Sequence, residues 1–90
     1  MKTVTFTAEA WQDYLYWVEN DKKILKKINR LIEQIARDPF KGSGNPEPLK
    51  FHLSGYWSRR INLKERLIYK VEKDRLLIIS CRVLTQFYWA

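Results

Sequence analysis

The sequence predicts an α+β fold in which two helices near the N-terminus pack on a mostly antiparallel sheet, in the order βααββββ. Two observations support this prediction. Apolar residues recur with the period of a helix between residues 8 and 37, and with the period of a strand through most of the chain after residue 48. Successive strands joined by short turns are typical of antiparallel pairing.

One domain is expected to cover residues 1–90, because single cores usually occupy about 100 to 150 residues. Hydrophobic residues make up 46% of the chain, which holds four Trp, five Tyr and four Phe. A disordered chain rarely carries so many bulky apolar groups, so the composition indicates a packed core.

The first strand and helix follow from residues 3–19. Val4 and Phe6 alternate with threonines, a pattern that predicts a short strand with one buried face. Thr7 is then placed to cap a helix that runs to about Glu19. Its apolar positions follow the i, i+3, i+4, i+7 spacing: Trp11, Tyr14, Leu15 and Val18.

A second helix is expected directly afterwards, capped by Asn20 or Asp21. Its apolar stripe consists of Ile24, Ile28, Leu31, Ile32 and Ile35. The helix should end before Pro39, because a proline disfavours helical geometry at the residue that precedes it. The two helices therefore form a hairpin with a very short connection.

Residues 39–48 hold all three prolines and two of the three glycines, so regular structure should stop there. Residues 49–54 then alternate apolar and polar side chains, which predicts a strand ended by Gly55. Residues 56–62 and 66–72 predict a β-hairpin. Residues 76–81 are continuously apolar up to Ser80, as in a strand covered on both faces near the sheet centre.

The charge is strongly positive and unevenly distributed. Seventeen Lys and Arg against ten Asp and Glu give a net charge of +7, which favours an anionic partner. Residues 8–21 are acidic, whereas residues 22–38 and 57–66 carry an excess of basic residues. An ordinary solvated helix face is an equally good interpretation of the run at 22–38.

Several classes of site are excluded by the residues present. His52 is the only histidine and Cys81 the only cysteine, so a zinc site of the usual three or four ligands cannot form. The glycines do not follow a dinucleotide or P-loop pattern. We therefore expect no metal and no cofactor. Neither an export leader nor a membrane span is apparent, so the expected location is the cytoplasm, away from membranes.

A cluster of basic residues surrounds one carboxylate that is flanked by prolines, Glu47. Cleaving RNA without a metal requires a base for the 2′-hydroxyl, cations for the charged phosphorane and an acid for the leaving oxygen. Glu47 suits the first role, and three basic residues suit the second: Lys50, Arg60 and Arg66. A surface network of salt bridges would use the same residues, so the composition leaves both interpretations open.

Several long segments resemble the YoeB/Txe family of bacterial toxins, within the RelE superfamily. They are WQDYLYW (11–17), KKIN (26–29), DPF (38–40), GNPEPLK (44–50), LSGYWSRRI (53–61) and RLIY (66–69). The resemblance covers residues 1 to about 82 and implies a RelE-like fold. It also implies a ribosome-dependent endoribonuclease of a type II toxin–antitoxin module, which cuts messenger RNA in the ribosomal A site and is restrained by a YefM/Axe-type antitoxin.

The resemblance assigns roles to individual residues. Glu47 would be the general base and Arg66 a second catalytic residue, while Lys50, Arg59 and Arg60 would bind the substrate phosphates. The implied reaction is attack of the 2′-oxygen on the adjacent phosphorus. Family members are commonly homodimers and contact operator DNA through their antitoxins.

The chain departs from the family pattern in its tail, residues 83–90. Leu84 and Thr85 stand where the family has a histidine, its general acid, and a terminal tyrosine. Because leucine cannot donate a proton, Leu84 is not functional in that role and activity should be impaired. Two alternatives follow: a non-catalytic module that binds RNA or the ribosome, and a module that only binds an antitoxin.

Overall fold

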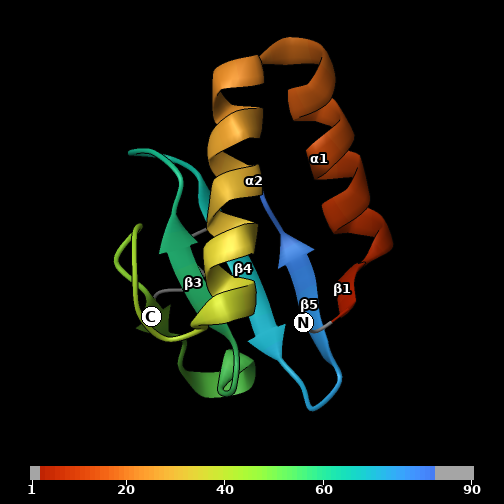
Figure 1. The fold of residues 1–90 in the computed structure, drawn as a ribbon. Coiled ribbons are helices and arrows are strands. Elements are labelled where there is room, and N and C mark those ends of the chain that lie inside the picture. Colours follow the sequence, from red (N-terminus) through yellow and green to blue (C-terminus); the bar gives the residue numbers. More distant parts are fainter. Residues whose placement is uncertain (1–2, 83–90) are drawn as a thin grey trace.

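The computed structural model describes residues 3–82, so the divergent tail with Leu84 and Thr85 lies outside the described residues. Two helices lie side by side over one face of a five-stranded sheet (Figure 1). The elements are β1 (Thr3–Phe6), α1 (Ala8–Asn20), α2 (Lys22–Arg37), β2 (Glu47–Pro48), a 3₁₀ helix η1 (Phe51–Leu53), β3 (Trp57–Arg60), β4 (Arg66–Val71) and β5 (Arg75–Ser80). Neither helix between residues 3 and 82 combines the length and apolar character of a membrane span.

The strands are arranged in the order β1-β5-β4-β3-β2. β1 pairs with β5 in parallel, and the other three pairs are antiparallel. The predicted α+β class and mostly antiparallel sheet are therefore confirmed, as is the β3–β4 hairpin. β5, expected near the centre, lies between β1 and the central strand β4.

Both helices begin at the predicted caps. The Thr7 hydroxyl accepts a hydrogen bond from the Ala10 amide at 3.1 Å, and the Asp21 carboxylate accepts from the amides of Lys23 and Ile24. These side chains satisfy amide groups that the first turn of a helix leaves without a partner. Asp21 thus starts α2 one residue after α1 ends, which produces the short hairpin.

The core lies between the helices and the sheet. Its fully buried members from α2, β4 and β5 are Ile28, Leu31, Ile35, Leu67, Tyr69, Leu76 and Ile78. Burying one such side chain stabilises the fold by about 1.5 to 3 kcal/mol before the entropy cost of ordering it. Because neighbours on a strand point to opposite faces, Arg66 and Lys70 of β4 lie on the face away from the helices.

The predicted strand at residues 49–54 is wrong. Only Glu47 and Pro48 pair with β3, and residues 51–53 form η1. Phe51 has a left-handed φ of 58°, and the Leu53 amide donates to the Lys50 carbonyl at 3.1 Å, so the chain turns instead of extending. His52 therefore does not share a strand face with Lys50.

Candidate active site

The open face of the sheet, which the helices leave uncovered, presents two arginines opposite each other. Arg60 of β3 pairs in register with Arg66 of β4. Their neighbours along the strands, Arg59 and Leu67, are fully buried. Arg59 donates a hydrogen bond to the side chain of Gln34 on α2, so it points to the helix-covered face. Arg60 is exposed, and the Arg66 side chain keeps 15% of its surface accessible. The hairpin therefore holds two guanidinium groups together on the open face.

Glu47 joins these arginines through the short strand β2. It pairs in register with Ser58, which places its side chain on the same face as Arg60. One Glu47 carboxylate oxygen lies 3.8 Å from a guanidinium nitrogen of Arg66. The same oxygen accepts a hydrogen bond from the side-chain amide of Asn45 at 2.8 Å. The Glu47 side chain is 42% exposed. The Glu47 carboxylate is thus partly accessible to solvent and ligands, whereas the Arg66 nitrogen that faces it is buried.

The loop before β2 is fixed to β3 by its backbone. The Arg60 amide donates to the Gly44 carbonyl at 2.6 Å. Gly44 has a φ of 84°, and a Cβ there would lie only 2.9 Å from the Arg60 carbonyl oxygen. A residue with a side chain would therefore push the loop away from the strand. This close contact between Gly44 and Arg60 positions the following residues, Asn45 and Glu47, beside β3.

The electrostatic environment of Arg66 favours an anion. Burial lowers the pKa of Arg66, the neighbouring Arg60 lowers it further, and Glu47 acts in the opposite direction. Arginine remains protonated at neutral pH, so the two like charges persist side by side. A bound phosphate would relieve their repulsion, and the planar forks of the two side chains suit its oxygens.

Arg59 has a different role from the one that the resemblance assigned. It is fully buried on the helix-covered face, and its Nε donates to the Tyr69 hydroxyl at 3.2 Å. Its remaining donors reach the backbone oxygens of Asp38 (2.8 Å), Lys41 (2.7 Å) and Ser43 (3.2 Å). Tyr69 in turn donates to the Pro39 carbonyl at 2.7 Å. Arg59 and Tyr69 together form a clasp that holds the 38–43 loop on the sheet.

The assignment of Arg59 to substrate phosphate binding is therefore corrected. Its donors are directed at protein oxygens beneath the loop, where a phosphate has no access. A signal in the sequence identifies the error: Arg59 and Arg60 are adjacent on a strand, so only one of them can point to the open face. The roles of Tyr69 and Asn45 were not predicted, because both depend on contacts across the fold.

Lys50 is exposed and precedes η1, three residues after Glu47. Among the contacts of residues 3–82, none joins it to the Glu47–Arg66 pair. His52, within η1, is also exposed. No group of three or more His, Cys, Asp or Glu side chains in the described part of the chain is arranged to hold a metal ion.

Helix α1 holds the end of β5 through both polar groups of the Cys81 backbone. The Asp13 carboxylate accepts from the Cys81 amide at 3.1 Å, and the Trp17 indole donates to the Cys81 carbonyl at 2.7 Å. Burial raises the pKa of Asp13, an effect that this hydrogen bond opposes. Burial also raises the pKa of the Cys81 thiol to about 12, so the thiol stays protonated.

Comparison with known proteins agrees with this architecture. A family model for the YoeB-like toxin of bacterial type II toxin-antitoxin system matches residues 6–84. Toxin YoeB of Streptomyces coelicolor is 60% identical over 79 residues, which cover 88% of this chain and 94% of that protein.

Solved structures give the same result. The YoeB/ParE toxin from Agrobacterium tumefaciens superposes with a TM-score of 0.91 at 44% identity, covering 94% of this chain and all of that one. The Staphylococcus aureus YoeB has been solved as a dimer (TM-score 0.88, 45% identity, coverage 93% and 98%). It has also been solved in a heterotetrameric YoeB–YefM complex (0.87, 44%, coverage 94% and 99%).

These matches confirm the RelE-like fold and define the class of protein: a toxin of a bacterial type II toxin–antitoxin system. Within that class, the chain belongs to the YoeB family.

Proposed function

We propose that this toxin is a ribosome-dependent endoribonuclease that cuts messenger RNA in the ribosomal A site. The observation that supports the proposal is the contact between Glu47 and Arg66, 3.8 Å apart on the open face, with Arg60 directly opposite Arg66. A base next to two cations provides two of the three kinds of group that cleavage of a phosphodiester by its own 2′-hydroxyl uses.

In the proposed reaction, the Glu47 carboxylate takes the proton of the 2′-hydroxyl as the 2′-oxygen forms a bond to the adjacent phosphorus. The bond from phosphorus to the 5′-oxygen breaks, and the leaving oxygen takes a proton from water. Arg66, Arg60 and Lys50 balance the negative charge that accumulates on the phosphorane oxygens. The products are a 2′,3′-cyclic phosphate and a 5′-hydroxyl.

The partners of the proposed function are the ribosome, messenger RNA and an antitoxin. Because a related Staphylococcus aureus toxin forms a complex with YefM, we assign a YefM-type antitoxin to this chain. Contact with operator DNA would then occur through the antitoxin. The dimer of that same relative supports a homodimer here. Action on ribosomes implies a cytoplasmic location.

A second candidate function is a non-catalytic module that binds RNA, the ribosome or the antitoxin. It is favoured by one observation, the replacement of the family's histidine and tyrosine by Leu84 and Thr85. Loss of a general acid typically lowers a rate by about 10² to 10⁴. The nuclease function therefore predicts slow cleavage, whereas the non-catalytic function predicts none. The second function predicts salt-dependent binding without any cleaved product.

The test is cleavage of a messenger RNA bound to ribosomes, with 2′-deoxyribose at one mapped cleavage position. We expect the ribose substrate to be cut to a 2′,3′-cyclic phosphate end and the deoxyribose position to resist. Cleavage that continues at the deoxyribose position would contradict attack by the 2′-oxygen. Absence of cleavage in both substrates, with ribosome binding retained, would favour the second function.

A further inference from the structure

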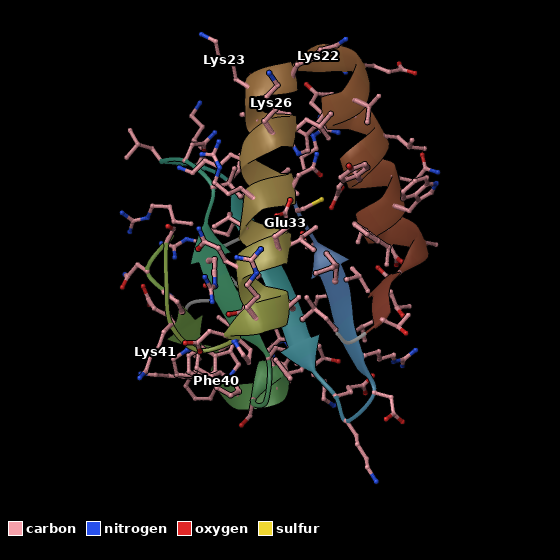
Figure 2. The ribbon with its side chains drawn as sticks, in the orientation of Figure 1. Lys22, Lys23, Lys26, Glu33, Phe40 and Lys41 are labelled. Carbon is pink, nitrogen blue, oxygen red and sulfur yellow. The ribbon has the colours of Figure 1, made fainter. Side chains whose placement is uncertain are left out.

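Five cations line the outer surface of α2, on the side of the molecule away from the open face of the sheet. The α2 ridge consists of Lys22, Lys23, Lys26, Lys27 and Arg30, all of them exposed. Figure 2 shows three of them, Lys22, Lys23 and Lys26, gathered at the N-terminal end of the helix. Helical spacing arranges the ridge in two adjacent rows, Lys22–Lys26–Arg30 and Lys23–Lys27.

This arrangement opposes the stability of the helix. The N-terminal end of a helix carries a partial positive charge and favours acidic residues, yet the first turn of α2 has none. Only the cap, Asp21, is acidic there. The ridge also contains three like-charged pairs at the i, i+4 spacing, each of which disfavours the helix. A local arrangement that lowers stability is typical of a functional surface.

The charges of the ridge are not neutralised within the described fold. Between residues 3 and 82, no ion pair and no side-chain hydrogen bond involves a ridge residue. The acidic residue within α2, Glu33, lies three residues beyond Arg30 and forms no ion pair with it. Glu9 and Glu19 belong to the neighbouring helix α1. The ridge therefore remains available to an external anion.

The chemistry of the ridge distinguishes between anionic partners. Interfaces between proteins have an apolar centre. The large exposed apolar side chains of the described residues lie on α1, in η1 and in the connections, none of them on α2: Trp11, Leu15, Val18, Phe40, Phe51 and Leu63. A phosphate backbone, by contrast, is bound mainly through charge and needs no apolar centre. From Lys22 to Arg30 the ridge extends roughly 12 Å at 1.5 Å per residue, enough to contact several phosphates of a double helix.

We propose that the α2 ridge binds the phosphate backbone of double-stranded RNA. The surface is separate from the Glu47–Arg66 site, because α2 covers one face of the sheet and that site occupies the other. One molecule can then bind an RNA helix on α2 while its opposite face holds the strand to be cut. The choice of RNA over DNA rests on the proposed function.

The test is fluorescence anisotropy with a labelled 16-base-pair RNA duplex at several salt concentrations. The variant Lys22→Ala/Lys26→Ala removes two ridge charges, and the control Lys41→Ala/Lys73→Ala removes two charges from exposed residues elsewhere. We expect the ridge variant to bind roughly tenfold more weakly at low salt, with a salt slope smaller by about 2. The control should change affinity less than about threefold. Alanine at exposed helix positions favours the helix, so Tm should not fall in the ridge variant.

Equal losses of affinity in the two variants, or an unchanged salt slope in the ridge variant, would overturn the proposal. So would a DNA duplex that binds tenfold or more tightly than the RNA, or ridge-dependent binding of polyglutamate without binding of the RNA duplex. The variant Glu47→Gln distinguishes this proposal from the nuclease proposal. It should abolish cleavage and leave duplex binding undiminished, so the two proposals can fail separately.

Discussion

Two neighbouring arginines on β3 illustrate how the two faces of the sheet differ. Arg59 points to the helix-covered face, where it is fully buried and its donors are occupied by protein oxygens. Arg60 points to the open face, is exposed and lies opposite a second arginine. The residue type is the same, so the face of the strand decides which arginine holds the fold together and which meets a ligand.

The comparison extends to the neighbouring elements. On the covered face, Arg59 and Tyr69 fix the 38–43 loop by hydrogen bonds to its backbone. On the open face, Glu47 and Arg66 form a longer ion pair, at 3.8 Å, and the carboxylate side of that pair is partly exposed. Substitutions on the covered face should therefore change stability, and substitutions on the open face should change activity.

The largest effect on stability is expected from Arg59→Ala. It leaves the carbonyl oxygens of Asp38, Lys41 and Ser43 without their donor, and we expect the free energy of unfolding to fall by about 3 kcal/mol. For a domain of this size, each 1 kcal/mol lowers Tm by about 4 to 8 °C. Urea titration and thermal unfolding provide the measurement. The matched control, Arg60→Ala, should change stability by less than about 0.5 kcal/mol, and equal losses in the two variants would refute the comparison.

A smaller loss of stability is expected from Asp13→Ala. The buried Cys81 amide would lose its acceptor, which should cost about 1 to 3 kcal/mol. Asp13→Asn keeps an oxygen in that position and should restore most of the difference. Urea titration at pH 7 compares the three proteins, and an alanine variant as stable as the wild type would show that the contact contributes nothing.

On the open face, Asn45→Ala should lower activity and leave stability nearly unchanged, unlike the two substitutions above. It removes the donor that holds one carboxylate oxygen of Glu47 but leaves no buried group unpaired. We expect the cleavage rate to fall about five- to tenfold, corresponding to roughly 1 kcal/mol, while stability changes by less than about 0.5 kcal/mol. A loss of stability with an unchanged rate would place Asn45 with the structural residues.

The smallest effect is a dependence of stability on pH that originates at Asp13. Burial raises the pKa of Asp13 above its ordinary value of 3.8, so the folded protein holds this proton more tightly than the unfolded chain. The resulting stabilisation is complete below pH 3.8 and is lost as the pH rises through the folded pKa. The free energy of unfolding of the wild type, relative to Asp13→Asn, should therefore fall between pH 3 and pH 7. A relative rise would contradict the direction of the shift.

Much of the fold was predictable because its signals are local. Thr7 and Asp21 cap the helices through nearby amides, and the stripes of apolar residues define the buried faces. The turn within residues 49–54 was not predictable in this way, since the alternation of apolar and polar residues there is equally compatible with the strand that we predicted. The left-handed φ of Phe51 leads the chain into η1 there.

The candidate site was predicted in part. The site brings together Glu47, Arg60 and Arg66, because the strands β2, β3 and β4 are adjacent. The resemblance to the toxin family anticipated this grouping, whereas the spacing of the three residues in the sequence did not establish it. The burial of Arg59 depends on a loop that folds back over β3, a long-range contact without a local signal. Only the alternation of side chains along β3 showed that Arg59 and Arg60 must differ.

The central claim is that Glu47 and Arg66 form a catalytic pair on the open face of the sheet. Single-turnover cleavage of messenger RNA on ribosomes tests it most directly, with Glu47→Gln and Arg66→Ala compared with the wild type and with Lys73→Ala as a control. We expect both site variants to lose at least about 10²-fold in rate, while the control retains the wild-type rate. Cleavage by all four proteins at the same rate would contradict the claim.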